Sequence, residues 1–145
     1  MTQSNIDLIR NTTLIKSLSY GDVHTNLKNG KFKIVSYKKN SVIHFDGELC
    51  SKLEIIISGK VVIDRIEESG NLLTISEFYK DDILGGNLLF SKNPYYPMTV
   101  STQLSTDILE IDKEVLFELF CNNPVFLRTY LELTSDRAFI LEDKI

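Results

Sequence analysis

The segment LEIIISGKVVI, residues 53–63, contains two runs of alternating apolar residues on either side of a Ser58-Gly59 pair. Apolar side chains at every second position are typical of β-strands with one buried face, and a Ser-Gly pair supplies the conformation that a tight turn needs. The segment therefore predicts a β-hairpin.

The same alternation continues on both sides of this hairpin, between residues 31 and 111. Apolar residues at this spacing are Phe32, Ile34, Leu73, Ile75, Val100 and Ile108. Further turn signals occur at Asp46-Gly47 and Ser69-Gly70-Asn71. Many short strands separated by such turns predict a mainly β domain, either a sandwich or a barrel.

The apolar spacing becomes helical from Asp112 onward. We expect a short helix with Asp112 as its N-cap. Its apolar face is formed by Val115, Leu116, Leu119 and Phe120. Asn123, as a second N-cap, and Pro124 then predict a longer helix over residues 124–145.

The longer helix has the spacing of a coiled-coil seam, with steps of four and three residues at Leu127, Leu131, Thr134, Ala138, Leu141 and Ile145. A second apolar row contains Phe126, Tyr130, Leu133 and Ile140. One alternative is a single amphipathic helix packed on its own barrel. Two rows favour two contact surfaces, and we expect a homodimer through this helix.

Composition excludes several functions. The 145 residues fit one domain, and a net charge of −4 with a pI near 5.2 lacks the basic surface that DNA binding requires. The N-terminus lacks an apolar run long enough for a signal peptide or membrane span, so we expect a cytoplasmic protein without membrane contact. The two cysteines, Cys50 and Cys121, predict buried thiols rather than an iron–sulfur cluster.

Catalysis has little support in the sequence. The only histidines are His24, expected at the surface, and His44, interpreted as structural or exposed. Two histidines cannot supply the usual metal site of a cupin-type enzyme, which is a remote alternative. No nucleophile, base and orienting group can be proposed together. We expect no enzyme activity, no metal and no cofactor.

The order of segments from Val42 onward resembles the effector domain of Crp/Fnr-family transcription regulators. The matching segments are VIHFDGE (42–48), LEIIISGKVVI (53–63), EESGN (67–71), DDILGGNLLF (81–90), YYPMTVST (95–102) and ILEIDKEVLFELFCNNPVFL (108–127). The resemblance implies a double-stranded β-helix, or jelly roll, barrel with flanking helices over residues 1–123. It implies a long dimerisation helix over 124–145, followed by a winged helix-turn-helix domain that binds DNA.

Within this resemblance, residues 85–102 are similar to the family's phosphate-binding cassette, where glycines open a short helix facing a cyclic phosphate. In members that bind cyclic AMP, an acid matches Gly86, an arginine matches Tyr96 and a serine matches Pro97. The adenine contacts match Leu141 and Glu142. Losing the arginine removes about 1.5–3 kcal/mol of phosphate binding. We therefore expect an unidentified small-molecule effector other than cyclic AMP.

The candidate effector-binding residues are Gly85, Gly86, Asn87, Leu88, Tyr95, Tyr96, Met98 and Thr99. Apolar and aromatic side chains among them suit a less polar ligand. Two alternatives remain open at this point. Tyr95, Tyr96 and Met98 fill or cover the barrel so that no ligand binds, or the chain is a free-standing regulatory module that acts through a protein partner.

Overall fold

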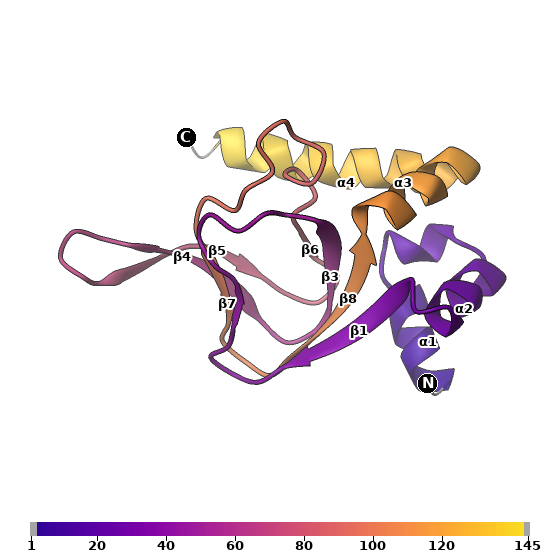
Figure 1. Ribbon diagram of the computed structural model, residues 1–145, viewed down its shortest axis with the longest axis horizontal. Helices are drawn as coiled ribbons and strands as arrows, with labels where there is room; N and C mark the ends of the chain where they lie inside the picture. The colour runs from indigo at the N-terminus through magenta and orange to yellow at the C-terminus, as the bar shows by residue number, and fades with distance from the viewer. Residues whose placement is uncertain (1–2, 144–145) are drawn as a thin grey trace. The chain divides into compact units, whose positions relative to one another are not determined.

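The structure, a computed structural model, describes the backbone of residues 3–143 and the side chains of residues 6–136 (Figure 1). Within this described part of the chain, three short helices precede eight strands, and two helices follow them. The helices are α1 (Gln3–Arg10), the 3-10 helix η1 (Ile15–Ser17), α2 (Tyr20–Lys28), α3 (Lys113–Asn122) and α4 (Pro124–Asp143). The strands are β1 (Phe32–Tyr37), β2 (Val42–His44), β3 (Lys52–Ser58), β4 (Val61–Ile66), β5 (Leu72–Phe78), β6 (Ile83–Leu84), β7 (Thr99–Thr102) and β8 (Thr106–Asp112).

These elements form two compact units. The strand unit contains residues 34–110, and the helical unit contains residues 1–33 together with residues 111–145. The expected division into a barrel domain over residues 1–123 and a dimerisation helix over residues 124–145 concerns functional parts of the chain, and it stays a prediction.

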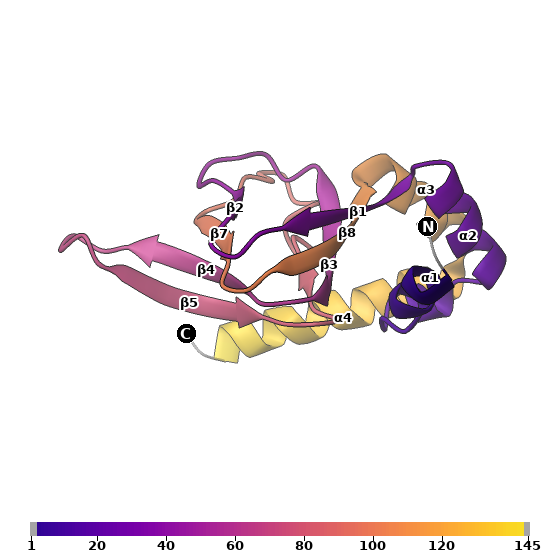
Figure 2. The ribbon, with the colours of Figure 1, turned by 90° about the horizontal axis from the view of Figure 1, so that it is seen from below.

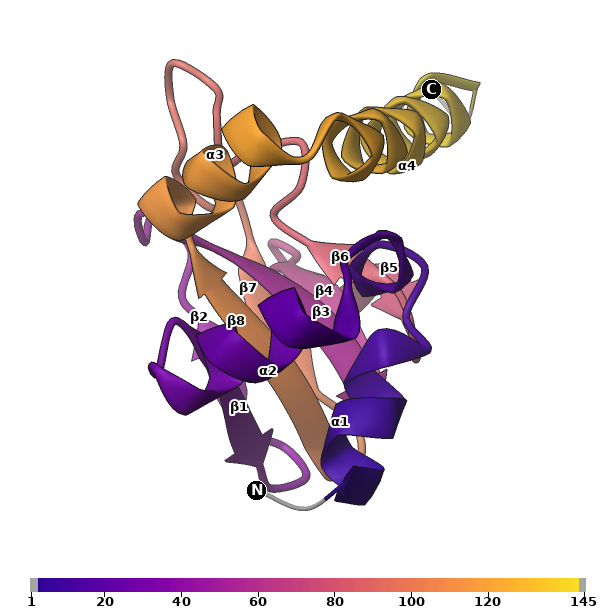
Figure 3. The same cartoon turned by 90° about the vertical axis from the view of Figure 1, so that its right-hand side faces the viewer.

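The strand unit consists of two four-stranded sheets, with strand orders β1-β8-β3-β6 and β2-β7-β4-β5 (Figures 2 and 3). The pairs β3–β6, β2–β7, β4–β5 and β4–β7 are antiparallel. Eight strands divided between two such sheets form a jelly roll. The predicted fold class, mainly β with flanking helices, is therefore confirmed.

Burial within the strands departs from simple alternation at two places. All residues from Leu53 to Ile57 are buried, so β3 is covered on both faces. In β5, by contrast, Leu73 and Ile75 are 41% and 43% exposed, and the prediction that they face the core was wrong. A register shift between Ile63 and Asp64 of β4 leaves Ile75 without a partner, which breaks the alternation there.

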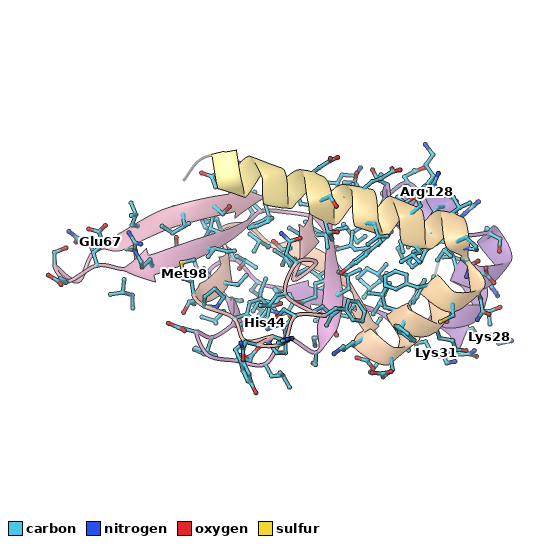
Figure 4. The ribbon with its side chains drawn as sticks, turned by 90° about the horizontal axis from the view of Figure 1, so that it is seen from above. Lys28, Lys31, His44, Glu67, Met98 and Arg128 are labelled. Carbon is cyan, nitrogen blue, oxygen red and sulfur yellow. The ribbon has the colours of Figure 1, made fainter. Side chains whose placement is uncertain are left out.

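The β4–β5 hairpin extends beyond the rest of its sheet. Strand β7 pairs with β4 only from Val61 to Asp64, so the remainder of the hairpin has no third strand beside it. Figure 2 shows the two strands running out together, and Glu67 lies near the tip (Figure 4). The lack of neighbours explains why the apolar side chains of this hairpin are exposed.

In the helical unit, an aromatic cluster joins α3 to α4. The ring of Phe120 lies 5.6 Å from that of Phe126 and 4.8 Å from that of Tyr130, measured between centroids. Phe126 and Tyr130 are both buried, whereas Leu131 is 52% exposed. The second apolar row of α4 therefore packs within its own unit, at least through Tyr130.

The caps of the two C-terminal helices differ in detail from the prediction. Asp112 occupies the N-cap position of α3, but its side chain makes no capping hydrogen bond. The Asn123 side chain donates through Nδ2 to the Leu119 carbonyl oxygen at 2.9 Å, so it caps the end of α3 instead of the start of α4. Cys121, in the last turn of α3, is exposed, and the prediction that it is buried was wrong.

Candidate functional site

The segment that begins at Gly85 forms a tight turn. The Leu88 and Leu89 amides donate to the Gly85 carbonyl oxygen at 3.1 and 2.9 Å, but the segment is a turn, and the expected short helix is not formed. Gly85 has φ +80°, and a Cβ there would lie 3.0 Å from Cys50 Sγ and 3.1 Å from the Tyr96 hydroxyl. Glycine is therefore required by both conformation and space.

The two tyrosines of the segment lie in opposite environments. Tyr96 is only 6% exposed, and its hydroxyl lies beside Gly85, whereas Tyr95 is 54% exposed. Residues 94–96 are held against residues 47–50 by backbone hydrogen bonds. They join the Gly47 amide to the Tyr96 carbonyl at 2.7 Å, the Tyr96 amide to the Glu48 carbonyl at 2.8 Å, and the Cys50 amide to the Pro94 carbonyl at 2.6 Å.

The other predicted effector-binding residues have mixed exposure. Gly86, Leu88, Met98 and Thr99 are half-buried, and Asn87 is exposed. Tyr96 and Gly85 are thus brought together, while Tyr95 and Asn87 are open to solvent. Binding of an effector by these eight residues stays a prediction.

Sequence reasoning missed the most distinctive group in this region. The His44 ring contacts a Glu48 carboxylate oxygen through Nδ1 and a Glu54 carboxylate oxygen through Nε2. It also stacks on the Tyr96 ring, with centroids 4.2 Å apart and planes inclined by 10°. We call His44, Glu48, Glu54 and Tyr96 the His44 cluster. His44 is 4% and Glu54 0% exposed, so of the two alternatives for His44, structural or exposed, the exposed one was wrong, and its contacts with carboxylates were not predicted.

The surroundings shift the pKa values of three members of this region. Burial alone would lower the pKa of His44, but hydrogen bonds and charge from Glu54 and Glu48 outweigh it, and the pKa is raised above 6.5. Burial, with help from Glu54, raises the pKa of Tyr96 far above its usual value. Burial and then the charges of Glu54, Glu110 and Glu48 raise the pKa of Tyr37 to about 12. Both phenols are therefore protonated and neutral at physiological pH.

Acidic groups outnumber basic ones around the cluster. Lys52 pairs with Glu110 at 3.0 Å, and Glu48 and Glu54 both contact the His44 ring. Such a site does not suit a phosphate, because the ligand would meet like charges in a partly desolvated position.

One sequence signal could have pointed to this cluster. Glu54 interrupts an otherwise apolar strand, and a carboxylate is almost never fully buried without a partner. The partner could not be identified from sequence, because the contact with His44 depends on how β2 and β3 are placed by the two sheets. Among the residues that the structure describes, no group of three or more His, Cys, Asp or Glu side chains is arranged to hold a metal ion. Within the same residues, no helix is long and apolar enough to cross a membrane.

Comparison with known proteins identifies a family for the chain. Residues 34–123 match the family described as cyclic nucleotide-binding domain. No curated protein matches the chain.

Solved structures with this fold include three bacterial regulators. A transcriptional regulator from Thermotoga maritima has 23% identity and a TM-score of 0.73, over 81% of this chain and 93% of that chain. The sensor domain of the transcriptional regulator DNR from Pseudomonas aeruginosa has 18% identity and a TM-score of 0.78, over 99% and 94%. The catabolite activator protein of Thermus thermophilus has 19% identity and a TM-score of 0.73, over 91% of this chain but 61% of that chain. Because the family match extends from β1 through α3 and covers more than half of the chain, this chain belongs to the cyclic nucleotide-binding domain family.

Proposed function

We propose that this chain is the effector-sensing and dimerisation domain of a Crp/Fnr-type transcription regulator, without enzyme activity and located in the cytoplasm. The family match and the transcription regulators among its structural neighbours support this proposal. The proposal requires a DNA-binding domain, which the resemblance implies after the long helix. DNA contact belongs to that domain, because the acidic chain itself lacks the charge for it.

The effector is a small molecule other than cyclic AMP. The observation that carries this part is the place of Tyr96, whose buried hydroxyl lies against Gly85 and Cys50 where the cyclic-AMP-binding relatives of this family have an arginine. The neighbouring carboxylates of Glu48 and Glu54 oppose a phosphate further. The half-buried Leu88, Met98 and Thr99 favour a less polar ligand.

Calorimetric titration of the chain with cyclic AMP tests this choice. We expect no heat of binding, corresponding to a Kd weaker than about 1 mM. Binding in the micromolar range would overturn the exclusion of cyclic AMP.

A thermal-shift panel of less polar metabolites searches for the effector itself. For any compound that raises Tm, we expect the shift to be lost in Met98→Ala, because Met98 belongs to the candidate site. Ile66→Ala is the matched control, since Ile66 is apolar but 71% exposed on the β4–β5 hairpin. A shift that survives Met98→Ala would move the effector site away from this segment.

Dimerisation is proposed through the seam of α4. Burial of Phe126 and Tyr130 against Phe120 leaves Leu131 exposed, which supports a second surface on this helix. Leu127 is half-buried and Thr134 donates to the Tyr130 carbonyl oxygen at 3.0 Å. The remaining seam residues, Ala138, Leu141 and Ile145, lie outside the residues whose side chains the structure describes.

Light scattering coupled to gel filtration tests the dimer. We expect a mass twice 16.6 kDa for the native chain and 16.6 kDa for Leu131→Lys, because a lysine on the seam places like charges opposite each other. Asp136→Lys is the control, since the heptad places residue 136 opposite the seam. A native mass of 16.6 kDa at tens of micromolar chain, or a dimer that persists in Leu131→Lys, would contradict the proposal.

A further inference from the structure

The contacts of the His44 ring imply a particular number of protons. A neutral imidazole has one N–H and one nitrogen lone pair, so it can donate to only one carboxylate. In this structure Nδ1 contacts Glu48 and Nε2 contacts Glu54, and both partners are carboxylate oxygens. Two such contacts require a second proton, and the imidazole, whose two nitrogens face the two carboxylates, is the group that carries it.

The two carboxylates differ in what happens when that proton leaves. The Glu54 side chain is fully buried, whereas the Glu48 side chain is 40% exposed. A neutral His44 retains one N–H. We expect this N–H to donate to Glu54, because an unpaired carboxylate inside the barrel would destabilise the fold. Glu48 can instead turn to water. Loss of the proton therefore breaks the contact between His44 and Glu48 first.

Glu48 lies in the connection that holds the Tyr96 segment. Its backbone carbonyl accepts from the Tyr96 amide at 2.8 Å, and the Gly47 amide next to it donates to the Tyr96 carbonyl at 2.7 Å. The Tyr96 ring stacks on His44, and an aromatic face attracts an imidazolium more strongly than a neutral imidazole. Both links to residues 94–96 are thus strongest when the extra proton is present.

We propose that His44, Glu48 and Glu54 form a proton-binding site, and that its bound proton latches the segment around Tyr96 onto the connection between β2 and β3. The inference goes beyond the proposed effector function, because the ligand is a hydrogen ion held by the chain's own residues. Release of the proton loosens residues 94–96, at the place where the effector is expected. A regulator built on this domain is then sensitive to pH as well as to its effector.

All ionisable groups facing His44 are consistent with this assignment. Glu48, Glu54 and Tyr96 contact the His44 ring directly. Further out, Cys50 interacts with Tyr96, and Tyr37 interacts with Glu54, Glu110 and Glu48. Lys52 pairs with Glu110 at 3.0 Å, and the two phenols stay protonated because their pKa values are raised. Glu54 and Glu48 are thus the groups that raise the pKa of His44.

Nitrogen-15 NMR of the histidine rings tests proton binding directly in the native chain. The chain has only two histidines, and the exposed His24 serves as the internal reference, assigned with His24→Gln. We expect the His44 midpoint above 6.5, with both ring nitrogens protonated at pH 6.5. We also expect the midpoint to fall in Glu48→Gln, which removes one anionic partner. A His44 ring that is neutral at pH 6.5 would overturn the proposal.

The pH dependence of unfolding gives a second test. A raised pKa in the folded state means that the stabilisation is complete below the unfolded value of 6.5 and is lost as pH rises through the folded value. We therefore expect the native chain to lose stability relative to His44→Gln above pH 6.5, while His24→Gln follows the native chain. Parallel curves for the native chain and His44→Gln would contradict the proton site.

The latch itself is tested by hydrogen exchange. We expect the Tyr96, Gly47 and Cys50 amides to lose protection above the His44 midpoint, after correction for the intrinsic pH dependence of exchange. The Gly70 amide, which bonds to Glu67 at the tip of the β4–β5 hairpin, is the control and should not respond. Unchanged protection at Tyr96 would remove the latch. None of these experiments uses an effector or DNA, so their failure leaves the proposed function untouched, and failure to find an effector leaves the proton site untouched.

Discussion

The strand unit contains a second cluster that is built from similar residue types to the His44 cluster but lies at the surface. Lys60 Nζ is 3.0 Å from a Glu77 carboxylate oxygen, the Tyr79 hydroxyl donates to Glu77, and the Lys60 ammonium lies 5.6 Å from the centre of the Tyr79 ring. Each cluster therefore combines a cationic group, carboxylate and tyrosine. They differ in burial, because Glu54 is 0% exposed whereas the Glu77 side chain is 44% exposed.

This difference determines what each cluster does for the protein. At the surface, the hydrogen bond from Tyr79 and the pairing with Lys60 lower the pKa of Glu77, but water can replace either partner. The Glu54 side chain, by contrast, is fully buried, so loss of His44 would leave its carboxylate charge without a partner at a high energetic cost. The same set of interactions is thus nearly dispensable on the β4–β5 hairpin and is structurally required between β2 and β3.

The largest expected effect follows from removing the buried carboxylate. Glu54→Ala leaves the His44 imidazolium without its buried partner and opens a cavity in β3. We expect the free energy of unfolding, measured by urea denaturation, to fall by about 3–5 kcal/mol.

Glu48→Ala is the matched variant on the exposed side of the same imidazole. We expect a smaller loss in the free energy of unfolding for Glu48→Ala. The Glu48 side chain is 40% exposed, so water can solvate His44 Nδ1 once the carboxylate is removed. Equal losses for the two variants would mean that burial does not distinguish the two carboxylates.

A second prediction concerns the space around Tyr96. Gly85→Ala adds a methyl group 3.1 Å from the Tyr96 hydroxyl at a residue with φ +80°, so it combines backbone strain with crowding. Gly47 has φ +88° but no atom within 4 Å of its added Cβ, so Gly47→Ala measures the strain alone. We expect losses in the free energy of unfolding of about 2–3 kcal/mol for Gly85→Ala and about 1 kcal/mol for Gly47→Ala.

If the two glycine variants lose the same stability, Tyr96 moves aside easily and is not packed as tightly as the His44 cluster requires. The comparison therefore measures how firmly the segment around Tyr96 is held, independently of pH.

The two clusters also show how far sequence could lead. Alternation predicted the strands, because the period of two directly reports one buried face, and it failed in β5, where a register shift leaves Ile75 unpaired. The absence of an arginine at position 96 was visible in the sequence. The replacement chemistry was not, because His44 and Glu54 come from strands of different sheets and meet only in the folded barrel. The available signal was Glu54, an acid between apolar residues of β3. Such a residue predicts that a buried partner exists, but it does not predict which residue the partner is.

The smallest expected effect lies in the surface cluster. Glu77→Gln removes the charge that Lys60 pairs with but keeps a hydrogen-bond acceptor for Tyr79, and water solvates the freed ammonium. We expect no change in the free energy of unfolding beyond the error of a urea titration, at low salt or high salt. A loss comparable to that of Glu48→Ala would imply that the hairpin depends on this ion pair to keep β4 and β5 together where no third strand supports them. In that event, the stability of each cluster would be set by the strands it connects, and exposure to water would no longer explain why the two clusters differ.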